Sequence, residues 1–287
     1  MRKLSLFAAF IAVTVVFSGQ KVYAGPPFNN LEGVGGVAFN PLAYVADSSE
    51  EGSHLKVGDV EVLGRPRFGA WYVNLGDKKI DWTSFGVADT LFKRVEISYG
   101  YQTIALRDIT TFHKNNIGVK GLLLQENSFG SQFVPAISIG TVYKTTSDKN
   151  LRKIGIGNLR TTGQDWYAVA TKTITQTPIP VILSGGILSS QEYVTGVLGF
   201  DKDREITGFA NIDFVLPHGF VVGYEFKQGE QFDDGYKNAN YWNAHLAWLA
   251  NKNLTLIAAY TYTGNIKAET TRTGLGGGFV LSAQYAF

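Results

Sequence analysis

The last ten residues of the chain, 278–287, read GFVLSAQYAF. Every second residue from Phe279 to Phe287 is apolar or aromatic, whereas the residues between them are smaller and more polar. Because successive side chains of a strand point to opposite faces, this alternation predicts a β-strand with one apolar side. The apolar side continues to the last residue, although the termini of soluble domains usually fray. The fold must therefore give this strand an apolar environment up to the end of the chain.

This strand resembles the C-terminal signature of bacterial outer-membrane β-barrels, in which the chain ends on an aromatic residue and carries another one two residues earlier. The matching residues here are Tyr285 and Phe287. The resemblance implies that the machinery that assembles such barrels recognises these two residues as an assembly signal. The alternative is the closing strand of a soluble β-sandwich, and the rest of the chain has to decide between the two.

Residues 1–24 have the features of a secretory signal peptide. Arg2 and Lys3 precede an apolar run over residues 4–17, and the stretch 22–24 offers a cleavage site before Gly25. The apolar run is too short to span a membrane as a helix. We therefore expect a protein of a Gram-negative bacterium that is exported through a cleaved signal peptide and resides in the outer membrane.

The composition of the chain favours strands and excludes several classes of protein. No apolar run after residue 24 is long enough for a transmembrane helix, so the chain can span a membrane only as a closed barrel with every backbone group paired. Its 33 Gly, 19 Phe and 14 Tyr favour strands and turns over helices. The absence of cysteine excludes a disulfide framework. A net charge of +2 gives no electrostatic reason to expect binding of nucleic acid.

Residues 25–64 differ from the rest of the chain. The stretch 31–44 is rich in glycine and contains Pro41, which cannot donate a hydrogen bond in a central strand. An acidic and polar stretch over residues 47–54 follows. We expect an N-terminal arm that lies inside the barrel as a plug, where glycines let the backbone run close to a wall. One or two additional strands are the alternative.

Residues 65–287 show a regular succession of strands. Twelve candidate strands lie near 66–74, 79–89, 95–104, 115–124, 132–144, 165–174, 180–188, 206–216, 219–228, 240–250, 254–263 and 276–287. The first two alternate poorly, whereas later ones such as 254–263 alternate well. Counting back from Phe287, short links alternate with longer ones, which are expected at 264–275, 229–239, 189–205, 145–164 and 104–114. Short periplasmic turns and long outer loops are typical of outer-membrane barrels. The sequence therefore predicts an all-β, antiparallel transmembrane β-barrel of about twelve strands, or fourteen if the arm contributes two.

The face that alternates with the apolar face is expected to line the lumen of the barrel. The expected lumen-lining residues are polar and carry both signs of charge: Glu96, Lys120, Lys172, Asn211, Asp213, Glu225, Lys227, Tyr241, Asn243, His245 and Gln284. Opposite charges on neighbouring strands could neutralise each other and stiffen the interior. The same residues could instead line a pore and set its solute preference. Neither interpretation excludes the other.

No catalytic or metal-binding constellation stands out in the sequence. The four histidines, at positions 54, 113, 218 and 245, lack metal-ligand spacing, and none is followed two positions later by the serine that an outer-membrane phospholipase requires. A protease site made of His113, Asp233 and Asp234 is not favoured. The acidic stretches 201–203 and 233–235 are expected to be solvated loops rather than cation sites. We therefore expect no enzyme, no metal and no cofactor.

Several segments together resemble an uncharacterised family of exported bacterial proteins, the domain of unknown function 3034. The resemblance rests on residues 31–36, 40–43, 94–98, 116–120, 136–141, 248–256 and 276–287. It spans nearly all of the expected mature chain, and its motifs are structural. The resemblance implies an outer-membrane barrel and transfers no catalytic or ligand-binding residue. Around residues 52–64 this chain carries an additional stretch between the arm and the first strand.

These observations lead to the hypothesis of a narrow outer-membrane channel for a small solute, with residues 25–64 as a partial plug or gate. The expected partners are outer-membrane lipid, the barrel assembly machinery and a small solute of unspecified identity, but no nucleic acid. One alternative is a non-conducting structural barrel that binds surfaces through its loops 145–164 and 189–205. The other is an outer-membrane hydrolase, for which the His-x-Ser pair is absent.

Overall fold

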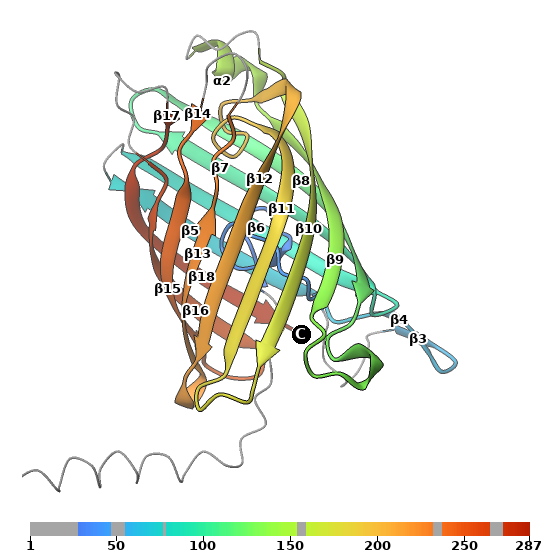
Figure 1. Ribbon diagram of the computed structural model, residues 1–287. Coiled ribbons are helices and arrows are strands. Elements are labelled where there is room, and N and C mark those ends of the chain that lie inside the picture. Colours follow the sequence, from blue (N-terminus) through green and yellow to red (C-terminus); the bar gives the residue numbers. More distant parts are fainter. Residues whose placement is uncertain (1–27, 47–54, 77–78, 154–158, 232–236, 265–271) are drawn as a thin grey trace, which may run out of the picture.

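The structure, a computed structural model, describes residues 28–46, 55–76, 79–153, 159–231, 237–264 and 272–287. In this part of the chain, twelve strands form one antiparallel barrel (Figure 1). The barrel strands are β5 (Arg67–Leu75), β6 (Ile80–Leu91), β7 (Val95–Leu106), β8 (Thr110–Leu124), β9 (Ala136–Thr146), β10 (Thr162–Ile174), β11 (Val181–Glu192), β12 (Phe200–Val215), β13 (Phe220–Lys227), β15 (Tyr241–Leu249), β16 (Leu254–Tyr262) and β18 (Gly277–Ala286).

The barrel closes where the last strand meets the first. Strand β18 pairs with β5 from Phe279 opposite Asn74 to Ala286 opposite Arg67, and each other barrel strand pairs with its neighbours along the chain. Closure leaves no open sheet edge in the ring. The predicted all-β barrel of about twelve strands is confirmed, and the β-sandwich alternative is wrong.

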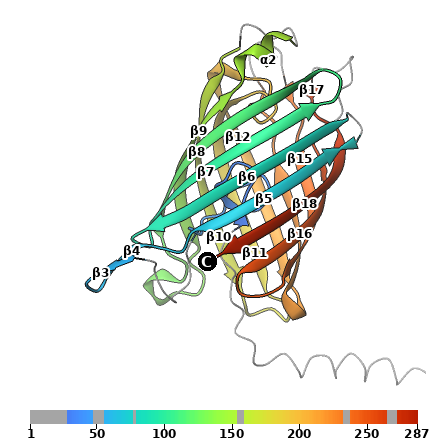
Figure 2. The same cartoon turned by 180° about the vertical axis from the view of Figure 1, so that it is seen from behind.

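The short strands lie outside the ring. Strands β3 (Leu55–Val57) and β4 (Val60–Leu63) form a hairpin that projects outward near the rim that holds the C-terminus (Figures 1 and 2). This hairpin joins the barrel through the pairing of Leu63 with Leu91. The alternative of a fourteen-stranded ring is therefore wrong, because these two strands do not enter it. Strands β14 (Lys237–Asn238) and β17 (Arg272–Thr273) form a parallel pair near the opposite rim.

The outer face of the barrel is apolar. Along most strands buried and exposed side chains alternate, and the outward ones include Phe85, Ile187 and Ile206, which are 62%, 58% and 72% exposed. An apolar band around a closed barrel is the surface that lipid covers in outer-membrane barrels. The helical elements within the described ranges are α2 (Asp148–Lys153) and two short 3₁₀ turns, η2 (Ser128–Gly130) and η3 (Pro217–Gly219). None of the helices found there has the length and apolar character to cross a membrane.

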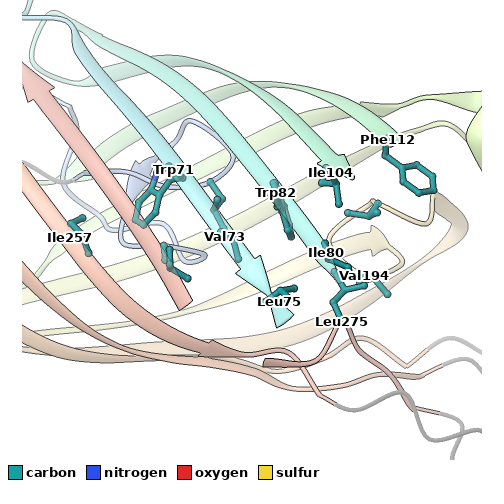
Figure 3. Close-up of a cluster of buried hydrophobic side chains, with 14 of the residues drawn as sticks. Trp71, Val73, Leu75, Ile80, Trp82, Ile104, Phe112, Val194, Ile257 and Leu275 are labelled. Carbon is teal, nitrogen blue, oxygen red and sulfur yellow. The ribbon is translucent and has the colours of Figure 1, made fainter. Parts of the chain in front are cut away.

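The two strands that alternate poorly in sequence, β5 and β6, carry apolar residues on both faces. Trp71, Val73 and Trp82 point into the barrel and belong to a buried cluster that also includes Val194 and Leu275 from links at the rim opposite the C-terminus (Figure 3). The inward face of these strands meets other parts of the chain instead of water. Because both faces are covered by apolar surroundings, the two-residue period is weak in this part of the sequence.

Two of the predicted long loops are short in the structure. Strand β7 ends at Leu106 and β8 begins at Thr110, which leaves three residues between them. Strands β11 and β12 are joined by residues 193–199 alone. The predicted loops 104–114 and 189–205 are therefore wrong. The pairing of these strands continues beyond the apolar band, where apolar and polar residues no longer alternate, so the sequence pattern ends before the strand does.

Candidate functional site: the filled lumen

Residues 28–46, here called the lumen segment, lie inside the barrel (blue in Figures 1 and 2). The segment contains a small strand pair, β1 (Phe28–Asn29) with β2 (Gly35–Gly36), and most of its side chains are buried. Backbone polar groups buried in a protein need partners. Side chains from the barrel wall supply many of them, so the wall holds a segment that is not part of its sheet.

Glu225 of β13 forms the most extensive of these attachments. Its buried carboxylate accepts hydrogen bonds from the backbone N–H groups of Ala38, Phe39 and Asn40, at 3.2, 3.0 and 2.6 Å. The side chain of Asn243 also donates to this carboxylate. Successive N–H groups directed at one anion form a favourable, charge-assisted site. This carboxylate therefore fixes the turn over residues 38–40.

An ion pair on the opposite side of the lumen holds Gly35. The backbone N–H of Gly35 donates to Glu96 at 2.8 Å, and Lys120 donates to the carbonyl oxygen of Gly35 at 2.9 Å. Glu96 and Lys120 are themselves 3.0 Å apart and both are buried. A Cβ atom at Gly35 would lie 2.5 Å from Glu96 Oε2 and 2.8 Å from Lys120 Nζ, so a side chain at this position would push the two charged groups aside.

Two wall glycines receive the backbone of the lumen segment. Gly86 and Gly100 lie opposite each other on β6 and β7. A Cβ at Gly86 would lie 2.8 Å from the Cα of Gly33, and one at Gly100 would overlap the carbonyl group of Glu32. Gly33 itself has a φ of +87°, a conformation that side chains disfavour. The glycines therefore form a notch in the wall that fits the segment's backbone.

A cluster of charged side chains lies towards the rim opposite the C-terminus. Lys144 of β9 contacts Glu32 and Asp165 at 2.5 Å each and Glu192 at 2.7 Å. Lys227 continues the cluster by pairing with Glu192 and, at 3.4 Å, with Glu230. Burial in the link after β13 raises the pKa of the Glu230 carboxyl above its ordinary value.

Lys114 of β8 connects the lumen segment to the turn 193–199. Its ammonium lies 4.0 Å from Glu32 and also donates to the carbonyl oxygen of Thr195. Val194 and Val197 of that turn are fully buried against the apolar cluster of β5 to β8. The turn therefore folds inward over the lumen, and Lys114 contacts both this turn and the lumen segment.

A chain of hydrogen bonds connects four side chains of the wall and ends at Glu225. The two ring nitrogens of His245 face Asp213 at 2.7 Å and the side-chain oxygen of Asn243 at 2.9 Å. Asn243 in turn donates to Glu225, which holds the lumen segment. His245 is thus a hydrogen-bonding residue of the lumen.

The model of the protein family DUF3034, described as a protein of unknown function, matches residues 26–282 of this chain. The chain belongs to this family. The resemblance inferred from the sequence motifs is therefore confirmed. A comparison with curated proteins gives no match.

Solved structures of outer-membrane proteins are similar to this family member. The KdgM porin has 12% identity and a TM-score of 0.50, and the match covers 77% of this chain and 99% of the porin. The NanC porin has 10% identity and a TM-score of 0.48, and the match covers 77% of this chain and 98% of that porin. The outer membrane phospholipase of Salmonella typhi has 8% identity and a TM-score of 0.41, and the match covers 83% of this chain and 94% of the phospholipase. At such low identity the likeness to the KdgM porin shows a shared barrel fold and nothing more.

Ten of the eleven expected lumen-lining residues point inward and are buried. These are Glu96, Lys120, Asn211, Asp213, Glu225, Lys227, Tyr241, Asn243, His245 and Gln284. Lys172 does not, because it shares the outward face of β10 with Trp166 and reaches Glu126 at 2.8 Å near the C-terminal rim. The expected assembly-signal residues Tyr285 and Phe287 lie on the outer face, where their rings contact each other.

Five charged residues on the wall strands that face the lumen within the described ranges were not among those expected from sequence: Arg67, Lys114, Lys144, Asp165 and Glu192. Lys114 lies one residue before the predicted strand 115–124, and Glu192 lies in a predicted loop. Lys114 does share the period of two with Lys120, which is six residues further along the same strand. Extending that alternation beyond the apolar residues would have found Lys114.

A cavity of about 50 Å³ lies between part of the lumen segment and the wall. It is lined by apolar side chains such as Trp82 and Phe209, and by the charged residues Glu32 and Lys144. Tyr167 and Tyr241 line the same cavity, and neither of their buried hydroxyl groups has a hydrogen-bond partner among the residues that the structure describes. A cavity of this size holds a few water molecules, which such hydroxyl groups can bind.

The described ranges contain no group of three His, Asp or Glu side chains placed to bind a metal ion. His113 lies on the outward face of β8 beside Tyr101, away from the lumen. Asp233 and Asp234, the other members of the disfavoured protease site, lie outside the described residues. The carboxylate of Asp201 accepts hydrogen bonds from Tyr193 and from the backbone of Asp203.

Proposed function

We propose that this protein is an outer-membrane channel for a small solute and that the lumen segment closes it. The observation that carries the proposal is the way in which the segment is held. Its backbone binds to charged side chains of the wall, such as Glu225, Glu96 and Lys120, without joining the barrel sheet. The segment can leave without breaking a strand pairing of the barrel.

The buried charges of the wall favour a lumen that also exists in a water-filled state. Replacing a buried ion pair by well-packed apolar side chains is often neutral or stabilising. The ion pairs of Lys120 with Glu96 and of Lys144 with its three carboxylates therefore add little net stability to a permanently filled barrel beyond holding the segment. In a channel, the same side chains meet water when the segment moves away, and they provide the polar lining that a solute requires.

The location in the outer membrane rests on several observations together. The outer face of the closed barrel is apolar, the terminal strand matches the outer-membrane signature, and residues 1–24 read as a signal peptide. With the C-terminus in the periplasm, the turn 193–199 and helix α2 face the outside of the cell. We include assembly through Tyr285 and Phe287 in this proposal.

Single-channel recording in a planar bilayer tests the proposal. We would compare residues 25–287 with a variant lacking the lumen segment 28–46, and with a control lacking residues 56–62 of the hairpin outside the barrel. We expect rare, brief openings from the first and the control, and a sustained current from the variant without the segment. Circular dichroism would establish that each variant retains its strands.

Two outcomes would contradict the proposal. Silence from folded barrels with and without the segment would show a non-conducting barrel, and the search for its role would move to the outer loops. Equal sustained currents from all three would show a pore that the segment does not close.

We propose no enzymatic role, because the sequence contains no His-x-Ser pair.

A further inference from the structure

Glu32 is the single charged residue of the lumen segment. Its carboxylate lies 2.5 Å from the ammonium of Lys144 and 4.0 Å from that of Lys114. Both lysines belong to the wall and are fully buried, whereas the side chain of Glu32 is 18% exposed. The segment therefore places one carboxylate on two lysines of the channel wall.

We propose that the wall carries a binding site for an organic carboxylate and that Glu32 occupies the place of the solute's carboxylate in the closed state. This inference rests on the proposed channel and specifies the class of its solute. A carboxylate that enters the lumen competes with Glu32 for Lys114 and Lys144. Binding of the solute and displacement of the lumen segment are then one exchange of ion pairs.

The charges of the cluster support this exchange. With Glu32 present, four carboxylates surround three lysines, and without it three remain: Asp165, Glu192 and Glu230. Lys144 and Lys227 keep these partners when the segment leaves. Lys114 does not, because Glu32 is its one ion-pair partner in the part of the chain that the structure describes. Once the segment leaves, the Lys114 ammonium keeps the carbonyl of Thr195 and meets water, but it has no carboxylate within ion-pair distance, so the emptied position suits a carboxylate of the solute.

The surroundings of the cluster specify the rest of the solute. Trp82, Phe209 and Leu188 of the wall line the cavity beside Glu32. Tyr167 and Tyr241 line it too, and within the described ranges their hydroxyl groups have no hydrogen-bond partner. On the segment's side the same cavity is lined by apolar residues, among them Leu31, Val34 and Phe39. When the segment leaves, the space of these side chains becomes available. The site therefore fits a carboxylate with an apolar or aromatic body.

The same lysine links the site to the turn 193–199. Lys114 donates to the carbonyl of Thr195 in this turn as well as pairing with Glu32. An ammonium has three N–H donors, so a carboxylate in the place of Glu32 competes with Glu32 and leaves the contact with Thr195 in place. The lumen segment is therefore expected to loosen when the solute binds, whereas the turn stays attached to Lys114.

Titration of the purified full-length barrel with benzoate, followed by calorimetry and by tryptophan fluorescence, tests the site. Benzamide is the neutral probe of nearly the same shape. Glu32→Gln removes the competing charge with little change in size, so we expect it to bind benzoate about tenfold more tightly than the parent, equivalent to about 1.4 kcal/mol. Asp59→Asn, in the hairpin outside the barrel, is the matched control and should bind as the parent does.

Lys114→Met combined with Glu32→Gln should lose the gain in affinity. Benzamide should bind weakly to every variant. Equal affinity of the parent and Glu32→Gln for benzoate, or equal binding of benzamide and benzoate, would overturn the proposed site.

A recording separates failure of the site from failure of the channel. In the barrel without residues 28–46, millimolar benzoate should reduce the current and benzamide should not. A sustained current that benzoate leaves unchanged would overturn the carboxylate site while the channel stands. A silent barrel whose Glu32→Gln variant still prefers benzoate would support the site and contradict the channel.

Discussion

Glu225 holds the lumen segment through three consecutive backbone N–H groups, at residues 38 to 40. Hydrogen bonds to a charged group contribute about 1.5–3 kcal/mol each, more than those between neutral groups. Glu225→Gln keeps the size of the side chain but replaces one acceptor oxygen by a donor. We expect the segment to be held less tightly by about 2 kcal/mol, which corresponds to roughly thirtyfold more frequent openings.

Single-channel recording of the Glu225→Gln variant measures this effect. The control is Asp148→Asn in α2, which removes an exposed carboxylate paired with Arg152. An opening frequency equal to that of the control would mean that Glu225 does not hold the closed state.

The sequence predicts the direction of single side chains well where the strand limits are clear. Alternation places His245, Asn243 and Glu225 in the lumen, and all three face inward there. The assignment of Lys172 to the lumen was wrong, because this lysine lies six residues after Trp166 on β10 and therefore on the same outward face. Polarity alone suggested the lumen for this lysine, although a long side chain near a rim can lie outside and reach a polar partner.

The contact of the lumen segment with strands β6 and β7 depends on the absence of side chains. Gly100→Ala would place a methyl group on the carbonyl of Glu32, where backbone rather than a flexible side chain must move. Overpacking of this kind typically costs about 1–3 kcal/mol. We expect the segment to be displaced while the barrel stays folded, so the channel should stay open for longer.

The matched control is Gly121→Ala on β8, where an added Cβ meets nothing within 4 Å. Open times from single-channel records and the barrel's thermal unfolding temperature measure the two effects separately. An unchanged open time for Gly100→Ala would contradict the close contact between segment and wall.

The terminal strand β18 carries a prediction about assembly. The ring of Phe287 packs 5.5 Å from that of Phe68 and 4.9 Å from that of Tyr285. Because the expected signal for the assembly machinery ends on this aromatic residue, Phe287→Ser should lower the amount of folded barrel in the outer membrane several-fold. Phe279→Ser removes an equally exposed ring from the other end of the strand and should have a smaller effect.

Heat-modifiable mobility in gel electrophoresis of outer-membrane fractions distinguishes folded from unfolded barrel. Equal losses for the two variants would indicate that the ring stabilises the barrel without acting as a signal.

At the scale of elements, all twelve barrel strands were among the candidate strands, although the period of two is weak in β5 and β6. This period could not find where β11 ends and β12 begins, since their pairing continues after the apolar residues stop. It also left the place of residues 55–63 open. Their hairpin has exposed apolar residues such as Val57 and Val60, so alternation does not distinguish it from a strand of the ring.

The whole molecule combines an apolar outer face with a polar lumen that its own chain fills. The Gly-rich composition of residues 31–44 indicated a segment able to lie against a wall. Its attachments could not be predicted, because they join backbone groups to side chains far away in sequence, as between residues 38–40 and Glu225. The same limit applies to the pairing of Glu32 with Lys144. Alternation reports which way a side chain points but not which backbone group it meets.

A reversible lock on the lumen segment tests its role as the gate most directly. A Cβ built on Gly118 of β8 lies 3.0 Å from Val34 Cγ2, so cysteine side chains at the two positions would meet and can be joined by a disulfide. Ser98 Oγ overlaps that Cβ, so the variant combines Val34→Cys, Gly118→Cys and Ser98→Ala. The natural chain has no cysteine, so this is the one disulfide the variant can form within its chain.

The measurement is the single-channel current of this variant, before and after a reductant is added, beside a control with Val34→Cys and Ser98→Ala alone. We expect no openings while the disulfide is intact, openings at the control's frequency after reduction, and no effect of reductant on the control. Openings that persist in the oxidised variant, with the disulfide verified by mass spectrometry, would contradict closure of the channel by the lumen segment.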